Sequence, residues 1–196
     1  NLLRLRGNAM QDAVPIGKGA MAALIGTNIE TAKKIIEKVK HYGICDIAND
    51  NSDSQVVISG DILAVENAMK LSKDLGIKKA VLLPVSAPFH CRLMKPAQII
   101  MKEALNKLNF KTPIVPIISN VDVSPESNPD KLRNNLIDQV TGTVRWRETM
   151  KLAENFGVKK IIELGSGKVL SGIAKRMIKN IVTINIENTK DFENFM

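Results

Sequence analysis

The chain of 196 residues is 44% hydrophobic and 24% charged, which argues against extended disorder and allows one good core or two modest ones. Its 28 basic and 20 acidic residues give a net charge of +8 and favour anionic partners, but with only 4% aromatic residues we expect no nucleic-acid binding. No apolar run reaches the roughly 18 residues that cross a bilayer and no signal peptide is evident, so we expect a cytoplasmic protein without membrane contact.

Residues 1–13 predict a helix with a cation on its apolar face. At about 100° per residue, Arg6 projects from the centre of that face. The face is formed by Leu2, Leu3, Leu5, Ala9, Met10 and Ala13. A guanidinium there needs an anion, because burying it unpaired is costly. The anion is either an Asp or Glu of the same protein or a substrate carboxylate or phosphate, which Arg binds with a planar fork.

Residues 17–83 predict a ferredoxin-like subdomain, because their elements follow the order strand, helix, strand, strand, helix, strand. The strands are expected at residues 19–26, 44–48, 55–59 and 80–85, with a polar turn at 49–54 and helices at 28–42 and between 61 and 76. A capping box of Thr27 and Glu30 is expected to open the first helix. Asp61 is expected to cap the second helix, which Gly76 ends.

Residues 84–196 alternate strands and helices with short links, which is typical of a mostly parallel sheet covered on both faces. Helices are expected at residues 93–108, 129–140, 147–156 and 169–179, and strands at 114–119, 160–164 and 181–186. With residues 1–16 they form the predicted body of the protein, and residues 17–83 form an insertion. One continuous α/β unit is the alternative.

The sequence offers no metal or phosphate-loop motif. Cys45 and Cys91 lack the spacing and the clustered histidines of a zinc site, and they do not make a disulfide framework. Residues 163–169 resemble a phosphate loop, but Ile162 replaces its first glycine and Val169 its Ser or Thr. These glycines predict a tight strand-to-helix turn. No Gly-X-Ser-X-Gly nucleophile elbow is present.

His90 is one of two histidines and follows a predicted strand, where side chains project from the rim of a sheet. Pro88 restricts the residue before it to extended geometry, so we expect the turn to hold the imidazole in place. Because no partner is visible in the sequence, the residues alone favour a hydrogen-bonded structural histidine over a functional one at position 90.

Several separated segments together resemble the malonyl-CoA:acyl carrier protein transacylases. They are residues 6–7 and 10–11, 19–23, 55–57, 89–90 within 84–96, 120–122 and 165–172, in order from residue 1 to about residue 186. The resemblance implies an α/β fold, with a partial α/β-hydrolase-like body and an inserted ferredoxin-like (α+β) subdomain. It also implies transfer of malonyl from malonyl-CoA to the phosphopantetheine thiol of acyl carrier protein in fatty-acid biosynthesis. Coenzyme A is then part of the substrate, and no cofactor is expected.

The resemblance also implies roles for individual residues. Arg6 matches the arginine that pairs with the free carboxylate of malonyl, and His90 matches the base that activates a serine nucleophile. Gln139 matches the position whose backbone carbonyl orients that imidazole, and Phe89 favours malonyl over methylmalonyl by crowding the α-carbon. Three further residues fall near the acyl pocket of the family, namely Met10, Asn51 and Gln55.

The family's Gly-Gln-rich loop and its Gly-His-Ser-Leu-Gly elbow have no counterpart in this sequence. We therefore expect the C-terminal portion of a transacylase, inactive alone because triad members act as a unit, and a separate N-terminal segment stays open as a partner. Alternatives are a poorly folding fragment with open sheet edges, or a noncatalytic module that binds acidic acyl carrier protein. The module would use cations on one helix, which otherwise form a solvated face: Lys168, Lys175, Arg176 and Lys179.

Overall fold

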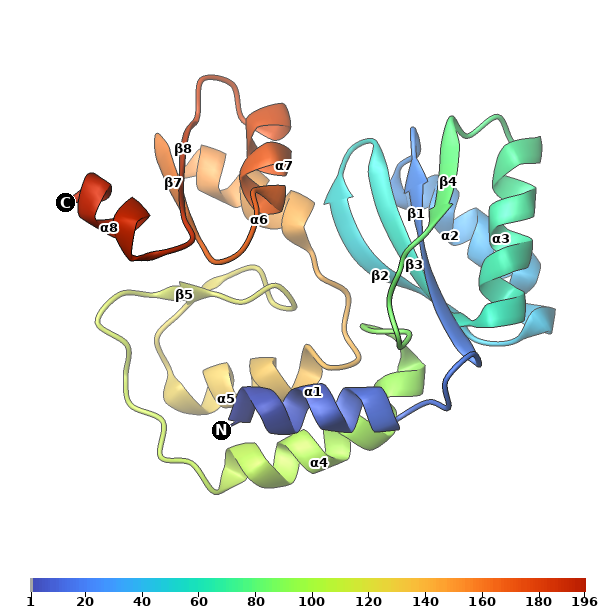
Figure 1. Cartoon of the computed structure of the whole chain (residues 1–196), viewed down its shortest axis with the longest axis horizontal. Coiled ribbons are helices and arrows are strands. Elements are labelled where there is room, and N and C mark those ends of the chain that lie inside the picture. Colours follow the sequence, from blue (N-terminus) through green and yellow to red (C-terminus); the bar gives the residue numbers. More distant parts are fainter. Residues whose placement is uncertain (1) are drawn as a thin grey trace. The chain divides into compact units, whose positions relative to one another are not determined.

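Helices and strands alternate along the chain in a computed structural model that describes residues 2–196 (Figure 1). Residue 1, where the first predicted helix was expected to start, lies outside this range. The chain divides into a first unit, Asn1–Trp146, and a second unit, Arg147–Met196. The mixed content of helices and strands confirms the predicted α/β class. Of the helices in residues 2–196, none is long and apolar enough to cross a membrane.

The first unit contains a four-stranded antiparallel sheet with the strand order β2-β3-β1-β4. Its strands are β1 (Gly19–Ile25), β2 (Cys45–Ser52), β3 (Gln55–Asp61) and β4 (Lys79–Leu82), and its helices are α2 (Ile29–Val39) and α3 (Ile62–Asp74). Both helices share one hydrophobic core with the sheet. This arrangement confirms the predicted ferredoxin-like topology. The division of the remaining chain into one body stays a prediction.

The opposite face of the sheet carries a smaller apolar cluster. Its buried members are Met21, Ala23, Ala48 and Val57, and Phe89 packs against them. Side chains of a strand alternate between the two faces of its sheet, so the same strands serve both cores. The sheet thereby contacts the segment that contains His90.

One of the two expected helix caps of this unit is wrong, and the other is correct in position but not in its hydrogen bond. Asn28, not Thr27, caps α2, and its Oδ1 accepts a hydrogen bond from Thr31 N at 3.0 Å. Helix α2 begins at Ile29, so Thr27 lies one residue too early for this role. Asp61 occupies the N-cap position of α3, as expected, but its carboxylate accepts a hydrogen bond from Ile44 N at 2.7 Å and makes no hydrogen bond to the first turn of α3.

The predicted turn at residues 49–54 is also wrong in extent. Strand β2 continues to Ser52, and Asn49 and Asp50 pair with β3 across two irregularities of register. Such bulges allow an irregular, polar stretch to stay in the ladder, which the residue composition does not indicate.

A helical layer completes the first unit. It contains α1 (Leu2–Asp12), the short 3₁₀ helix η2 (Arg92–Met94), α4 (Lys95–Asn106) and α5 (Pro129–Asp138), around a second buried cluster. The strand expected at residues 114–119 is reduced to β5 (Ile117–Ile118), which pairs with β6 (Pro125–Glu126). Residues 114–116 have no partner strand in the described part of the chain, so the apolar composition alone does not make them a strand.

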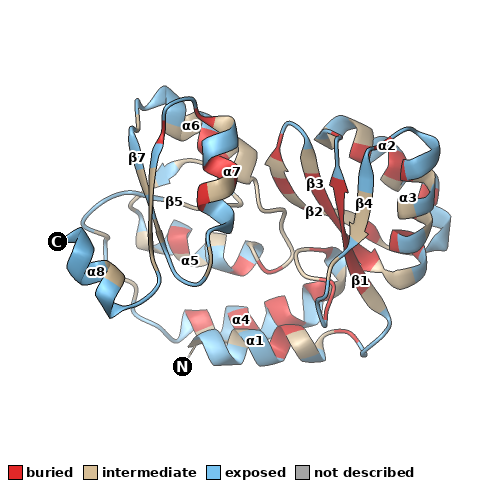
Figure 2. Cartoon of the chain, turned by 45° about the horizontal axis from the view of Figure 1, so that its top comes forward, coloured by how far each residue is buried: buried red, intermediate tan, exposed pale blue. Residues whose placement is uncertain are grey.

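Helix α1 buries only part of its predicted apolar face (Figure 2). Ala9 and Met10 are buried, and Arg6 on the same side is half-buried. Leu3 lies about two turns before Met10 on that face, yet it is 84% exposed. The helical period was therefore predicted correctly, but within residues 2–196 the Leu3 side chain is largely uncovered, whereas Leu2 packs partly against the buried cluster.

The second unit contains a parallel pair of strands and three helices. Its elements are α6 (Trp146–Asn155, whose first residue belongs to the first unit), β7 (Lys160–Leu164), α7 (Val169–Met177), β8 (Val182–Ile186) and α8 (Thr189–Phe195). The glycine-rich link from β7 to α7 is a tight turn, as predicted, with φ of +135° at Gly165 and +80° at Gly167. The Glu163 carboxylate accepts hydrogen bonds from the first turn of α7. Helix α8 was not predicted from the sequence, although Asn188 and Asp191 form a capping box at its start.

The close approach of β2 and β3 requires glycine at position 60. A methyl group there would lie 1.9 Å from the carbonyl oxygen of Ile44. We expect Gly60→Ala to lower the free energy of unfolding by about 3 kcal/mol, because the backbone of the sheet must move. Gly7→Ala is the matched control, since Gly7 lies in α1 with no atom within 4 Å of the added methyl group, and it should raise stability by about 0.5–1 kcal/mol. Urea unfolding followed by circular dichroism measures both, and equal midpoints would contradict the expectation.

Candidate active site

His90 lies in the link between β4 and η2 with an unusual backbone conformation. Its φ is +58°, in the left-handed region that residues other than glycine rarely adopt, although His does so more often than most. Cys91 Sγ donates to Pro88 O at 3.0 Å, and Phe89 N donates to Ala87 O at 3.1 Å. Pro88 is fully buried. These contacts fix the turn at residues 87–91, as expected. The left-handed conformation of His90 was not predicted from the sequence.

The imidazole of His90 contacts the backbone at the end of α5. Its Nδ1 lies 2.9 Å from the carbonyl oxygen of Gln139, which is the C-cap residue of α5. The last carbonyl groups of a helix have no intrahelical partner, so this oxygen is free to accept. A carbonyl can only accept, so Nδ1 carries the proton and Nε2 of the neutral ring keeps its lone pair. The Gln139 side chain instead donates to Gly142 O at 2.9 Å.

The surroundings of His90 favour the neutral ring. Burial lowers the pKa of His90 below 6.5, and the positive charge of Arg6 acts in the same direction. The hydrogen bond to Gln139 opposes these effects because it stabilises the protonated ring. A backbone hydrogen bond with Gly142 also opposes them, but burial is the largest of the four influences, so the neutral ring, which can accept a proton, is favoured.

Arg6 is a half-buried cation close enough to His90 to influence its pKa. Burial also lowers the pKa of Arg6 itself. In residues 2–196, no Asp or Glu forms an ion pair with Arg6 and no hydrogen bond to its guanidinium is found. The internal ion pair that the sequence left open is therefore not formed within this range. The guanidinium remains able to bind an anion brought from elsewhere.

Met10 and Phe89 form an apolar wall in the same region. Met10 is only 3% exposed, and both side chains belong to the cluster around α1, α4 and α5. Phe89 also packs against the sheet. A further contact ties α1 to the His90 link, because Gln11 and Ser86 hydrogen-bond to each other. This contact between α1 and residues 84–90 was not predicted from the sequence.

Asn51 and Gln55 belong to the hairpin of β2 and β3. They stand on either side of its turn, where Ser52 pairs with Gln55. Neither side chain hydrogen-bonds to Arg6, His90 or Gln139 within the described range. The structure thus brings together Arg6, Met10, Phe89, His90 and Gln139, whereas the assignment of Asn51 and Gln55 to an acyl pocket stays a prediction.

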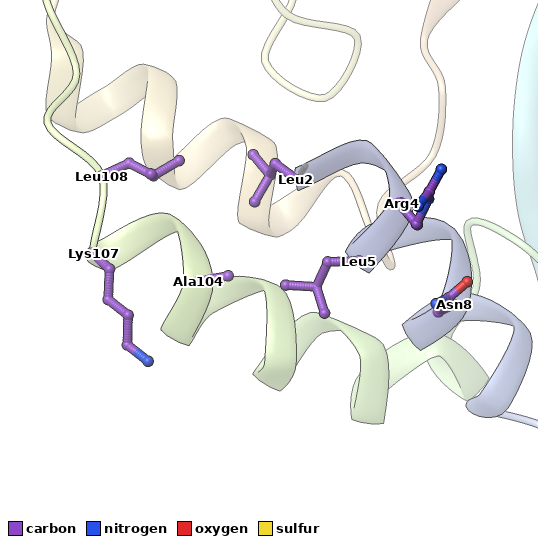
Figure 3. A pocket seen from close by; sticks show the side chains of 7 residues that line it. All are labelled: Leu2, Arg4, Leu5, Asn8, Ala104, Lys107 and Leu108. Atoms are coloured by element: carbon purple, nitrogen blue, oxygen red, sulfur yellow. The ribbon is translucent and has the colours of Figure 1, made fainter.

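A groove on α1 is distinct from this site. A groove of about 740 Å³ lies between α1 and α4 and is lined by Leu2, Arg4, Leu5, Asn8, Ala104, Lys107 and Leu108 (Figure 3). Arg4 lines this groove, whereas Arg6 and the other candidate site residues do not. It therefore carries no argument for the chemistry of His90.

The two cysteines do not add a nucleophile or a metal ligand to the site. Both are free and buried, and burial raises the pKa of Cys45 to about 12. A protonated, buried thiol is unreactive. In residues 2–196, no three His, Cys, Asp or Glu side chains come close enough together to hold a metal ion.

Comparisons with known proteins find closely similar chains, although no family model matches. A malonyl CoA-acyl carrier protein transacylase of Escherichia coli K12 is 42% identical over 180 residues, which cover 92% of this chain and 58% of that protein. The enzyme of that name from Bacillus subtilis is 40% identical over 192 residues, covering 97% of this chain and 61% of its own length. This chain therefore spans about three fifths of the length of the curated relatives that it matches.

Solved structures agree with these relatives. An acyl-carrier-protein-S-malonyltransferase from Bartonella henselae has a TM-score of 0.94 and 50% identity, covering 99% of this chain and 62% of that one. A malonyl-transacylase in complex with its type II PKS acyl-carrier protein has a TM-score of 0.93 and 38% identity, covering 98% and 62% respectively.

The pKa of His90 is the property of the site that is most directly measurable. We expect its NMR titration midpoint below 6.5, and we expect Arg6→Gln to raise it by removing a positive charge. Since the unfolded chain binds this proton more readily, the free energy of unfolding should fall as the pH drops below about 6.5 and level off below the lower folded value. His90→Gln should remove this pH dependence of the free energy of unfolding. Because His41 is the other histidine, a His41→Gln variant shows which NMR signals belong to His90. A midpoint above 6.5 would contradict the expected burial.

Proposed function

We propose, from the homology of this chain to the malonyl CoA-acyl carrier protein transacylases, that it supplies the base and the carboxylate-binding cation for malonyl transfer from coenzyme A to acyl carrier protein. The observation that carries the proposal is the 2.9 Å contact from His90 Nδ1 to Gln139 O, together with the nearby Arg6, which has no ion-pair partner among residues 2–196. An oriented base and a separate cation suit a substrate with a reactive thioester at one end and a carboxylate at the other.

His90 serves as general base in this proposal. Its Nε2 accepts the proton of a serine hydroxyl as the oxygen attacks the malonyl thioester, and the imidazolium then gives that proton to the departing thiolate of coenzyme A. In the second half, His90 accepts the proton of the phosphopantetheine thiol as its sulfur attacks the carbonyl of the malonyl-serine ester, and the imidazolium returns that proton to the departing serine oxygen. The serine comes from a part of the enzyme that corresponds to no segment of this sequence, because no nucleophile elbow is present.

Arg6 and the apolar wall select the acyl group. A guanidinium binds a carboxylate through two parallel hydrogen bonds, and partial burial strengthens this interaction. Arg6 has no ion-pair partner in the described part of the chain, residues 2–196, which supports a role in binding the malonyl carboxylate. Phe89 and Met10 limit the space around the α-carbon, which favours malonyl over methylmalonyl, and Asn51 and Gln55 are proposed as further acyl-pocket residues.

A hybrid enzyme tests this proposal. The hybrid joins this chain to the part of the Escherichia coli relative that its 180 matched residues do not cover. We expect transfer of malonyl from malonyl-CoA to acyl carrier protein. His90→Ala should lower kcat by about 10²–10⁴-fold, because it removes the base. Arg6→Ala should instead remove the preference for malonyl-CoA over acetyl-CoA, since acetyl has no carboxylate.

Arg4→Ala is the matched control for Arg6→Ala, because Arg4 lies on the same helix but lines the groove beside α4. It should leave the preference between the two thioesters unchanged. A folded hybrid that transfers no malonyl would argue against the proposal, as would equal effects of the two arginine variants.

A second candidate function is the binding of acyl carrier protein without catalysis, and the second unit carries the observation that favours it. A pocket of about 260 Å³ is lined by Lys168, Ser171, Gly172, Lys175, Thr183 and Asn185. Lys168 and Lys175 are exposed, as are Arg176 and Lys179. Clustered cations attract an acidic carrier protein by steering, and a similar malonyl-transacylase has been solved with its carrier protein.

Binding to carrier protein separates this surface from a merely solvated helix face. We expect the affinity of this chain for acyl carrier protein to fall with rising salt, and Lys175→Glu plus Arg176→Glu to weaken it at least about tenfold. Isothermal titration calorimetry measures both effects. Lys33→Glu plus Lys34→Glu on α2 makes the same change of charge elsewhere and should have little effect. Equal weakening by both pairs would show that only net charge matters.

A further inference from the structure

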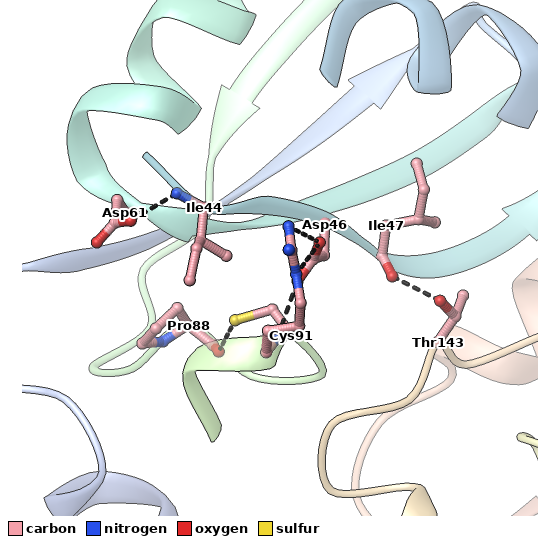
Figure 4. Close-up of polar contacts among 8 residues, drawn as sticks. Ile44, Asp46, Ile47, Asp61, Pro88, Cys91 and Thr143 are labelled. Carbon is pink, nitrogen blue, oxygen red and sulfur yellow. Dashed lines mark hydrogen bonds and ion pairs between the residues drawn. The ribbon is translucent and has the colours of Figure 1, made fainter. Parts of the chain in front are cut away.

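The edge strand β2 contacts the link that contains His90. The Asp46 carboxylate accepts a hydrogen bond from Arg92 N at 2.9 Å, and it also accepts from Arg92 Nε at 3.0 Å (Figure 4). An ion pair of 2.9 Å joins Arg92 Nη2 to Asp46 Oδ1. Asp46 therefore binds Arg92, two residues after His90, through both its backbone N–H and its side chain.

The same strand also contacts the segment that follows Gln139. Ile47 O accepts a hydrogen bond from Thr143 Oγ1 at 2.7 Å (Figure 4). The next residue of β2, Ala48, accepts from Val144 N at 2.8 Å. Three consecutive residues of one strand, 46–48, thus hold both partners of the bond between His90 and Gln139.

His90 needs support of this kind because of its backbone. A left-handed residue other than glycine persists only where its surroundings determine it. On the preceding side the contact from Cys91 to Pro88 closes the turn. On the following side, Asp46 is the acceptor for the first backbone N–H beyond Cys91.

The two halves of the contact between Asp46 and Arg92 differ in exposure. The Arg92 side chain is 68% exposed, and the Asp46 side chain is 24% exposed. Exposed ion pairs are weakened by water and salt, whereas a less exposed carboxylate bound to a backbone N–H holds the main chain directly. The backbone bond, not the guanidinium, therefore restrains the turn.

We propose that Asp46 is a positioning residue for His90, whose imidazole it directs toward Gln139 O by anchoring Arg92 N to β2. The relevance of this inference to catalysis rests on the proposed role of His90 as base. The orientation of the imidazole itself can be measured in this chain without catalysis. Asp46 touches no reacting atom, so its effect passes through the backbone.

Two substitutions break the bond from opposite ends. Asp46→Ala removes the acceptor. Arg92→Pro removes the donor at the first position of η2, where proline is tolerated, and the preceding residue Cys91 already has the extended φ and ψ of −137° and 172° that proline requires. Both variants should lower the fraction of the Nδ1–H tautomer of His90 at least twofold, measured by long-range ¹H–¹⁵N NMR above its titration midpoint.

Three controls isolate the backbone bond. Arg92→Ala loses the guanidinium but keeps the N–H, and Asp46→Asn keeps an acceptor oxygen, so both should retain the tautomer of the unaltered chain. Asp61→Ala removes a carboxylate that accepts Ile44 N at 2.7 Å in the same sheet, without touching the link (Figure 4). It should alter stability and leave the His90 signals in place.

The outcomes separate this inference from the proposed function. An unchanged His90 tautomer in a folded Asp46→Ala or Arg92→Pro variant overturns the inference, and so does an equal change in Asp61→Ala. If one of the two variants fails to fold, the other decides. In the hybrid enzyme, Asp46→Ala should lower kcat at least tenfold with KM for malonyl-CoA unchanged, whereas an inactive parent hybrid would count against the proposed function alone.

Discussion

The hydrogen bond from His90 Nδ1 to Gln139 O joins segments 49 positions apart and depends on backbone geometry at both ends. His90 holds a left-handed conformation, and Gln139 offers a carbonyl left unpaired by the end of α5. The side chain of Gln139 closes its own turn and is not the main acceptor. The orientation of the imidazole therefore follows from the fold of the main chain around it, more than from the identity of residue 139.

The ferredoxin-like sheet contributes to this region through the face that its own helices leave free. One face packs against α2 and α3, and the other packs against Phe89. Its edge strand β2 holds the backbone on both sides of the imidazole contact. Because alternate residues of a strand face opposite sides, each strand stabilises the sheet and shapes the site with different residues. The sheet is thus a structural support for the site as well as a folding unit.

Sequence patterns predicted the order of the sheet elements and the parallel pair β7 and β8, because periodicity and glycine turns are local signals. They also placed Arg6 on the apolar side of α1. They did not predict the left-handed φ of His90 or the contact of Asp46 with Arg92, since both depend on neighbours distant in sequence. For Gln139 only the resemblance to a family predicted a role for its backbone carbonyl. The expected burial of Leu3 is wrong, because the helical period identifies the apolar face of a helix but not which residues cover that face.

A backbone carbonyl as the partner of His90 has an electrostatic consequence for Arg6. A carboxylate in its place would add a full negative charge near the guanidinium, which would raise the pKa of the imidazole and compete for the cation. The carbonyl dipole fixes the ring tautomer without that charge. Arg6 then keeps its charge uncompensated within residues 2–196, and its proximity helps to hold the pKa of His90 low. In the proposed reaction the substrate carboxylate would bring the missing negative charge, so that binding of malonyl would partly offset the effect of Arg6 and make His90 a stronger base once the substrate is in place.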